Sequence, residues 1–228
     1  QEEAGIDVTH FPVELIDESV EAHKKLLYGF KGNLKANKTF VNQALKEVRH
    51  VALSLTGEPI TYPRINEMIN EFHKRKISTF LVTNAQYPEA IKNLTPVTQL
   101  YISVDAPDKT ILKEIDKPLF SDYWERLLKS LDYLRKKEDR TVIRLTLVKN
   151  KNMCDVKGYA DLIKRGDPDF IEVKGYMSAG ASEERLGFSY APKHEEVKTF
   201  GLGLVKLLPE YEYVSEHEPS AVILLAKK

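Results

Sequence analysis

The chain has 228 residues, of which 42% are hydrophobic, and its 34 basic side chains balance its 34 acidic ones. This length suits one globular domain with a barrel-sized core, and the balance excludes a general positive field for nucleic acid but not a local basic patch. No apolar run is long enough to cross a membrane and no signal peptide is visible, so we expect a soluble, cytoplasmic protein. The single cysteine, Cys154, excludes an internal disulfide.

Helical and apolar strand patterns alternate along the chain. Helices are expected at 13–30, 40–48, 65–76, 87–94, 108–115, 121–137, 155–165 and 193–208. Buried strands are expected at 51–55, 78–82, 99–104, 141–148 and 169–173. Two last strands, at 211–214 and 221–226, are expected to be antiparallel or peripheral. The alternation predicts parallel βαβ units with right-handed crossovers, and no linker divides the chain, so residues 1–228 are predicted to form one α/β domain.

Compact polar groups end or interrupt the five buried strands. They are Thr56-Gly57-Glu58, Thr83-Asn84, Ser103 with Asp105, Arg144 with Thr146, and Glu172 with Lys174. The carboxyl ends of parallel strands meet at one rim, which is where ligands bind in α/β sheets and barrels. Gly57 allows a ligand to approach the backbone, and Glu58 adds a carboxylate. The sequence therefore predicts a pocket for a polar, charged ligand.

The charged residues within the last two of these strands have more than one interpretation. Arg144 and Thr146 share one strand face, and a buried arginine needs a partner, which is Glu172, Asp105 or a ligand. Glu172 and Lys174 also share a strand face. Either they form a structural ion pair with each other, or Lys174 has a ligand-binding or catalytic role of its own. In the second case Lys174 is an anion clamp or an amine nucleophile.

Five strings carry a resemblance to a known family. They are HVALSLTGEPITYPRI, STFLVTNAQYPEAI, TQLYISVDAP, RTVIRLTLVK and PDFIEVKGYM. In this order, over about Phe11 to Lys228, they closely resemble the radical SAM domain of tRNA 4-demethylwyosine synthases. The resemblance implies a partial (β/α)6 radical SAM barrel, which is an incomplete TIM barrel. It also implies an enzyme that converts N1-methylguanosine-37 of tRNA(Phe) and pyruvate into 4-demethylwyosine through a 5′-deoxyadenosyl radical.

The resemblance further implies roles for single residues. Those expected to bind S-adenosyl-L-methionine (SAM) are Thr56, Gly57, Glu58, Thr83, Asn84, Ser103 and Asp105. Arg144 and Glu172 are expected on the substrate side or at the SAM carboxylate, and Lys174 is the expected catalytic residue. Thr56 stands where the superfamily usually has the first glycine of a GGEP segment.

One departure from the family is large. The family holds a 4Fe–4S cluster through a CxxxCxxC loop, and one cysteine cannot supply three thiolates. We expect that loop, the first strand, a second set of cluster cysteines and a pyruvate-binding lysine to precede this chain. The electron donor is expected to be of the flavodoxin type or another donor. The main alternative is a cluster-less RNA-binding or scaffold relative without activity, and a more remote one is a lysine-dependent aldolase that uses Lys174.

Overall fold

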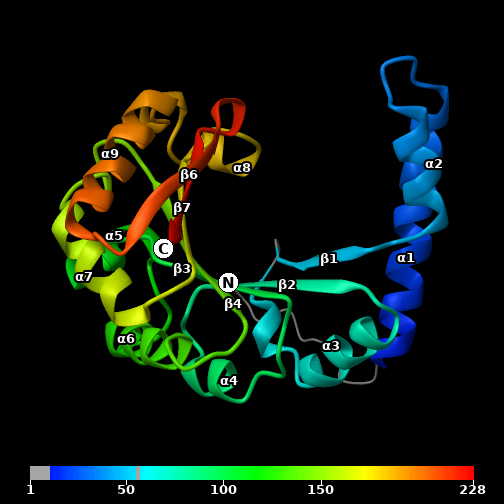
Figure 1. The fold of residues 1–228 in the computed structure, drawn as a ribbon, viewed down its shortest axis with the longest axis horizontal. Coiled ribbons are helices and arrows are strands. Elements are labelled where there is room, and N and C mark those ends of the chain that lie inside the picture. The colour runs from blue at the N-terminus through cyan, green and yellow to red at the C-terminus, as the bar shows by residue number, and fades with distance from the viewer. Residues whose placement is uncertain (1–10, 55–56) are drawn as a thin grey trace.

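One curved sheet organises the fold (Figure 1). The structure is a computed structural model and describes residues 11–54 and 57–228. The strands are β1 (His50–Leu53), β2 (Ser78–Thr83), β3 (Gln99–Ser103), β4 (Arg140–Leu147), β5 (Phe170–Gly175), β6 (Tyr211–His217) and β7 (Val222–Lys227). Their order in the sheet is β1-β2-β3-β4-β5-β7-β6. Strands β1 to β5 run parallel and β6 and β7 pair antiparallel, as the sequence predicts, and β7 lies between β5 and β6.

The helices follow the strands in the predicted alternation. They are α1 (Pro12–Tyr28), α2 (Lys38–Lys46), α3 (Ile65–Lys74), α4 (Pro88–Lys92), α5 (Lys109–Asp116), α6 (Tyr123–Leu134), α7 (Val156–Gly166), α8 (Ala181–Arg185) and α9 (His194–Leu207). Each predicted helix is present, with its ends displaced by a few residues. Helix α8 is not predicted, and β6 runs on to His217, beyond its predicted end at residue 214.

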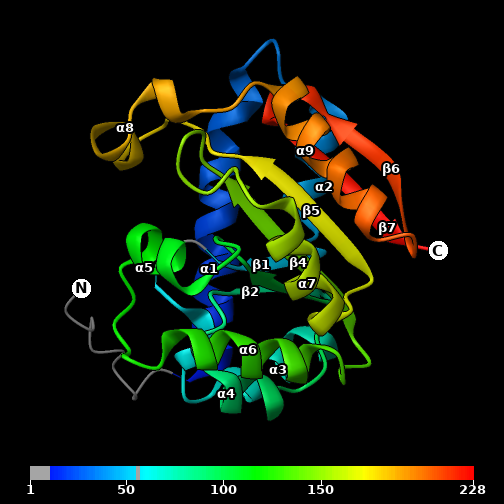
Figure 2. The same ribbon diagram turned by 90° about the vertical axis from the view of Figure 1, so that its left-hand side faces the viewer.

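The main helical layer covers the convex face of the sheet, and the opposite face is concave (Figures 1 and 2). Because successive side chains of a strand point to opposite faces, every second residue enters the convex core. Leu81, Ile102, Leu145 and Val173 are such residues, and all are fully buried. Helix α9 packs closely on β7, where a Cβ on Gly201 would overlap the end of the Ile223 side chain.

Two capped helices fix the loops that follow β3 and β4. At the start of α5, Asp108 Oδ1 accepts hydrogen bonds from the backbone N–H groups of Thr110 at 2.7 Å and Ile111 at 2.9 Å. At the start of α7, Asp155 Oδ1 accepts one from Gly158 N at 3.0 Å. Such caps satisfy N–H groups that the helix itself leaves unpaired. The chain between each strand and its helix is therefore held at both ends.

The N-terminal helices lie beside the edge strand β1. Ile16 of α1 packs with Phe72 and Ile77 in a small hydrophobic cluster. Beyond this contact, the second half of α1, the 3-10 turn η1 (Gly29–Gly32) and α2 rise past β1 on the concave side of the sheet (Figure 1). Among the described residues, no helix combines the length and the apolar character that crossing a membrane requires.

Candidate functional site

The turn after β1 depends on a glycine. Gly57 has a φ of +76°, a left-handed conformation that residues with a side chain rarely adopt. Apart from its chain neighbours, a Cβ at this position would meet no atom of the described residues within 4 Å, so conformation and not crowding requires the glycine. Thr56 lies outside the described residues, and its role stays a prediction.

Glu58 lies half-buried between the carboxyl ends of β1 and β2. Its Oε2 accepts a hydrogen bond from Asn84 N at 2.8 Å. Burial raises the pKa of Glu58, although the hydrogen bonds from Asn84 N and the Thr83 hydroxyl partly oppose this shift. Its Oε1 is buried without a hydrogen-bond partner among the described residues. The turn thus fixes one carboxylate oxygen and leaves the other for a cationic or N–H donor.

Thr83 and Asn84, which the sequence places together, point in different directions. Thr83 is only 1% exposed and has the same orientation as Leu81, toward the helical layer. Its hydroxyl accepts a hydrogen bond from Ala85 N at 3.2 Å in addition to its bond with Glu58. Asn84 is exposed at the rim, and its Oδ1 accepts a hydrogen bond from Gln86 N at 3.0 Å. The structure therefore gives Thr83 a positioning contact with Glu58.

Asp105 follows β3 at the same rim, two residues after Ser103. Its carboxylate accepts hydrogen bonds from the backbone and the hydroxyl of Thr146, and its Oδ1 is left without a partner among the described residues. Burial raises the pKa of Asp105 to about 6, against the opposing effects of these bonds and of the Arg144 charge. Ser103 is half-buried on the concave face, directly beside Arg144 in the neighbouring strand.

Asn152, which the sequence analysis missed, ties this part of the rim together. It is fully buried, and its Nδ2 donates hydrogen bonds to the backbone oxygens of Asp105 and Thr146, each at 2.7 Å. Its Oδ1 accepts one from Val148 N at 2.5 Å. One side chain thus joins the end of β3 to the end of β4. No sequence pattern distinguishes this asparagine from its neighbours in a polar loop.

Arg144 and Glu172 form an ion pair in the middle of the concave face. They are register partners in β4 and β5, with Arg144 Nε 2.8 Å from Glu172 Oε1. This Nε contact lacks hydrogen-bond geometry, whereas Nη2 donates a hydrogen bond to Oε2 at 3.3 Å. The guanidinium also lies over the ring of Tyr101, 4.6 Å from its centre. Of the partners that the sequence left open for Arg144, Glu172 is thus the one that forms the ion pair.

Lys174 lies half-buried on the same face, next to Thr146 in β4 and Val222 in β7. It makes no ion pair or hydrogen bond with the described residues. The structural Glu172–Lys174 pair, one of two interpretations of the sequence, is therefore wrong, because Glu172 turns to Arg144 instead. An amine placed in this way is available to an anionic or carbonyl group.

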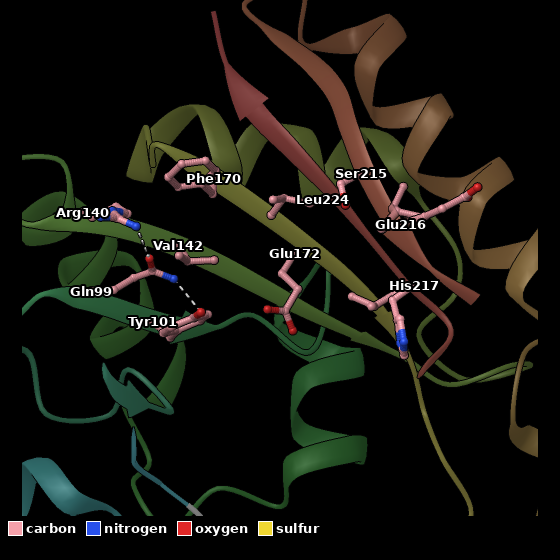
Figure 3. A pocket seen from close by; sticks show the side chains of 12 residues that line it. Gln99, Tyr101, Arg140, Val142, Phe170, Glu172, Ser215, Glu216, His217 and Leu224 are labelled. Atoms are coloured by element: carbon pink, nitrogen blue, oxygen red, sulfur yellow. Dashed lines mark hydrogen bonds between the residues drawn. The ribbon is translucent and has the colours of Figure 1, made fainter. Parts of the chain in front are cut away.

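A cavity of about 330 Å³ opens on the concave face beside this ion pair (Figure 3). Tyr101 and Glu172 line it, together with Phe170, and the Tyr101 hydroxyl accepts a hydrogen bond from Gln99 Nε2 at 2.5 Å. Gln99 and Phe170 are the first residues of their strands, so the cavity lies away from the rim that carries Glu58. The concave face thus has two parts, a strand-end rim and a cavity with aromatic and carboxylate walls.

Known proteins are similar to this chain both in sequence and in fold. A family model described as the radical SAM superfamily matches residues 35–163, and one described as wyosine base formation matches residues 165–227. The mouse S-adenosyl-L-methionine-dependent tRNA 4-demethylwyosine synthase TYW1 is 50% identical over 95% of this chain and 30% of the mouse protein. The synthase of the same activity from Pyrococcus abyssi is 41% identical over 95% of this chain and 64% of that protein.

Two solved structures of TYW1 are similar to this chain in fold. The structure of TYW1 with a lysine-pyruvate adduct bound superposes with a TM-score of 0.85 at 33% identity, over 96% of this chain and 70% of that one. The crystal structure of archaeal TYW1 gives a TM-score of 0.78 at 33% identity, over 96% of this chain and 71% of that one. The chain belongs to the radical SAM superfamily, within the family of tRNA 4-demethylwyosine synthases. It spans less than a third of the length of the mouse member.

Radical SAM proteins use SAM and a 4Fe–4S cluster, and this chain fits the two differently. The Oε1 of Glu58, buried and without a hydrogen-bond partner in the described part of the chain, suits the methionyl ammonium group of SAM, because a carboxylate oxygen without a donor favours a nearby cation. The cluster has no such fit, since Cys154 is the only cysteine in the sequence. The described residues also contain no group of three or more His, Cys, Asp or Glu side chains that could hold a metal ion.

Proposed function

We propose that this chain is the SAM- and substrate-binding part of an enzyme that converts N1-methylguanosine-37 of tRNA(Phe) and pyruvate into 4-demethylwyosine. The observation that carries the proposal is the row of polar strand ends that begins at Glu58, whose Oε1 has no hydrogen-bond partner among the described residues, in a chain of this family. The names of the relatives support the tRNA pathway, and the lysine-pyruvate adduct bound to TYW1 supports pyruvate as the co-substrate. A flavodoxin-type or other protein electron donor and a cytoplasmic location complete the proposal.

The rim residues bind SAM in this proposal. The Oε1 of Glu58 accepts a hydrogen bond from the methionyl ammonium group, while Asn84 N keeps the other oxygen in place. Gly57 shapes the turn, Thr56 precedes it, and Thr83 acts through Glu58. Ser103 and Asp105, at the end of the next strand, face the ribose and sulfonium part. With a pKa of about 6, the Asp105 carboxyl is mostly ionised at neutral pH and suits hydroxyl or cationic donors.

The concave face holds the substrates in this proposal. The Arg144–Glu172 pair lies between the rim and the cavity, so it faces the substrate side or the SAM carboxylate. The amine of Lys174, without a partner among the described residues, contacts the carboxylate or the carbonyl of a substrate. When bound together, SAM and the cluster supply the 5′-deoxyadenosyl radical, and the protein residues bind and orient the reactants.

The SAM site is tested with the Glu58→Gln variant. Loss of a charge-assisted hydrogen bond costs about 1.5–3 kcal/mol, so we expect SAM binding to weaken by about ten-fold or more. Equilibrium dialysis measures this on the full-length protein, reconstituted anaerobically with iron and sulfide. Asn84→Ala and Ser103→Ala should reduce 5′-deoxyadenosine formation more than tRNA binding. The control is Glu18→Gln, which changes an exposed carboxylate on α1. Equal SAM affinity of the Glu58→Gln variant and the wild type would contradict the assignment.

The reaction itself is tested by supplying SAM, pyruvate and the methylated tRNA to the same preparation. The proposal requires that the cluster thiolates come from residues beyond these 228, because one cysteine is insufficient. Formation of 5′-deoxyadenosine and the tricyclic base is the expected outcome. If neither forms while the tRNA still binds, the protein is the cluster-less RNA-binding relative.

Two substitutions of Lys174 separate its two roles. Lys174→Arg keeps a cation and removes the nucleophilic amine, whereas Lys174→Met removes both. An anion clamp predicts that the arginine variant retains pyruvate binding and the methionine variant loses it. An amine nucleophile predicts loss in both, and also a pyruvate-dependent mass increase on Lys174 after borohydride reduction. Normal pyruvate binding by both variants would remove Lys174 from the site.

A further inference from the structure

A single stretch of this neutral chain is strongly basic. Residues 22–46, hereafter the basic arm, contain no aspartate or glutamate. Their six lysines are Lys24, Lys25, Lys31, Lys35, Lys38 and Lys46. The acidic residues of α1, by contrast, all precede the arm and end at Glu21. The sequence therefore separates charge along one helix, with the acidic half near the helical layer and the basic half beyond it.

The basic arm is an ordered hairpin made of the second half of α1, η1 and α2. Gly29 and Gly32 bound the turn between the helices, and Asn37 caps α2 by accepting a hydrogen bond from Phe40 N at 3.0 Å. The buried Val41 anchors α2. The arm rises beyond the edge strand β1, on the side of the sheet that the main helical layer does not cover (Figures 1 and 2). It is therefore placed beside the concave face.

Five of the six lysines of the arm lack an acidic partner among the described residues. Lys24 contacts Glu21 at 3.1 Å, but none of the carboxylates in the described residues forms an ion pair with the other five, which are all exposed. Many lysines on the helical layer behave differently. Lys109 is paired with Glu125 at 2.8 Å, and Lys157 with Asp161 at 2.6 Å. Part of the positive charge of the helical layer is thus neutralised, whereas five of the six lysines of the arm have no ion pair within the described part of the chain.

Large aromatic side chains lie between these lysines. Tyr28, Phe30 and Phe40 are each more than half exposed, and the Lys31 amine lies 4.4 Å from the centre of the Tyr28 ring. A stretch of free lysines with exposed rings suits a nucleic acid, because lysines contact phosphates and rings stack on unpaired bases. The lysines are spread over two helices and the turn between them. This spread fits an extended polyanion that lies along the arm better than it fits a membrane surface.

We propose that the basic arm binds the phosphate backbone of the RNA substrate beside strand β1. RNA held there lies next to the concave face, so a nucleotide that leaves the stack can enter toward Tyr101 and the cavity. The identity of the RNA rests on the proposed function, whereas the charge and exposure of the arm do not. The arm acts through phosphate contacts that carry no sequence information, and the concave face reads the base.

The test measures RNA affinity and its salt dependence on the full-length protein. The arm variant combines Lys25→Gln, Lys31→Gln and Lys35→Gln. The control combines Lys113→Gln, Lys164→Gln and Lys206→Gln, which are exposed lysines on α5, α7 and α9. Fluorescence anisotropy with a tRNA transcript between 50 and 200 mM salt provides the affinities. Circular dichroism melting verifies that both variants fold.

We expect the arm variant to bind tRNA about ten-fold more weakly at low salt. Its slope of log affinity against log salt should fall by about 2–3, because each phosphate contact contributes about 0.9. The control should match the wild type. An unchanged affinity and slope in the folded arm variant would overturn the proposal, as would an arm-dependent binding to anionic vesicles stronger than that to tRNA. We expect the arm variant to bind SAM as the wild type does, so failure of the arm and failure of the proposed function give different results.

Discussion

The two faces of the sheet carry different kinds of side chain. Apolar residues on the convex face serve folding, whereas polar and charged residues on the concave face are available for binding. Ile102 and Leu145 point to the convex face and are fully buried beneath helices. Their neighbours Ser103 and Arg144 lie half-buried on the concave face. One strand can carry both kinds of residue because its side chains alternate between faces. The convex layer thus supplies stability and leaves the concave face free to hold polar and charged groups.

The largest expected effect compares two adjacent residues of β3. Ile102→Ala removes a fully buried side chain from the convex core and should lower the free energy of unfolding by about 2–5 kcal/mol. Ser103→Ala, one residue further on, should change it by less than about 0.5 kcal/mol, because its hydroxyl supports no core contact. Urea unfolding followed by circular dichroism measures both values. Similar losses in the two variants would contradict the division between the faces.

A second prediction concerns pH and the buried carboxyl at the rim. Burial raises the pKa of Asp105 to about 6, so the folded state binds its proton more tightly than the unfolded chain, where the pKa is near 4. The stability associated with this proton is present below about pH 4 and is lost as the pH rises through about 6. Burial and the Asp105 charge also raise the pKa of Asp116 to about 7, so the two carboxyls titrate as a pair. Asp105→Asn should therefore stabilise the protein at pH 7, by about 3 kcal/mol, and have little effect at pH 4.

The measurement is the difference in unfolding free energy between this variant and the wild type, from pH 4 to pH 8. Asp161→Asn is the control, since Lys157 holds the pKa of that exposed carboxyl below its usual value. A variant less stable than the wild type at pH 7 would show that an ionised Asp105 is required for folding.

The alternation of strands and helices was predictable from the sequence, because apolar runs and turn residues are local signals. The two errors in the predicted elements, the missed helix α8 and the early end of β6, have local causes. Helix α8 has five residues between Gly180 and Gly187, too few to show a helical period. Strand β6 shifts register between Tyr213 and Ser215, and this bulge breaks the alternation on which its predicted end depends.

The site was predicted as a set of strand ends but not in its pairings. Whether Arg144 meets Glu172 or Asp105 depends on strand register, which the packing of intervening helices fixes and no local pattern encodes. Period-two alternation does place Thr83 with the buried Leu81, and it places Tyr101 with Ser103 on the concave face. Those two orientations were available from the sequence, whereas the role of Asn152 depends on three backbone contacts from different strands and loops.

A third prediction, with a smaller effect on stability than the first two, concerns the Arg144–Glu172 pair. Both side chains are partly exposed, so a double-mutant cycle with Arg144→Met and Glu172→Gln should give a coupling energy of about 1 kcal/mol. The same substitutions remove the central charges of the concave face and should impair turnover far more than folding. Unfolding free energies and product formation, measured on the same preparations, test this difference. If stability and turnover fall together, the pair supports the sheet, and the concave face does not have the freedom that its lack of a helical cover suggests.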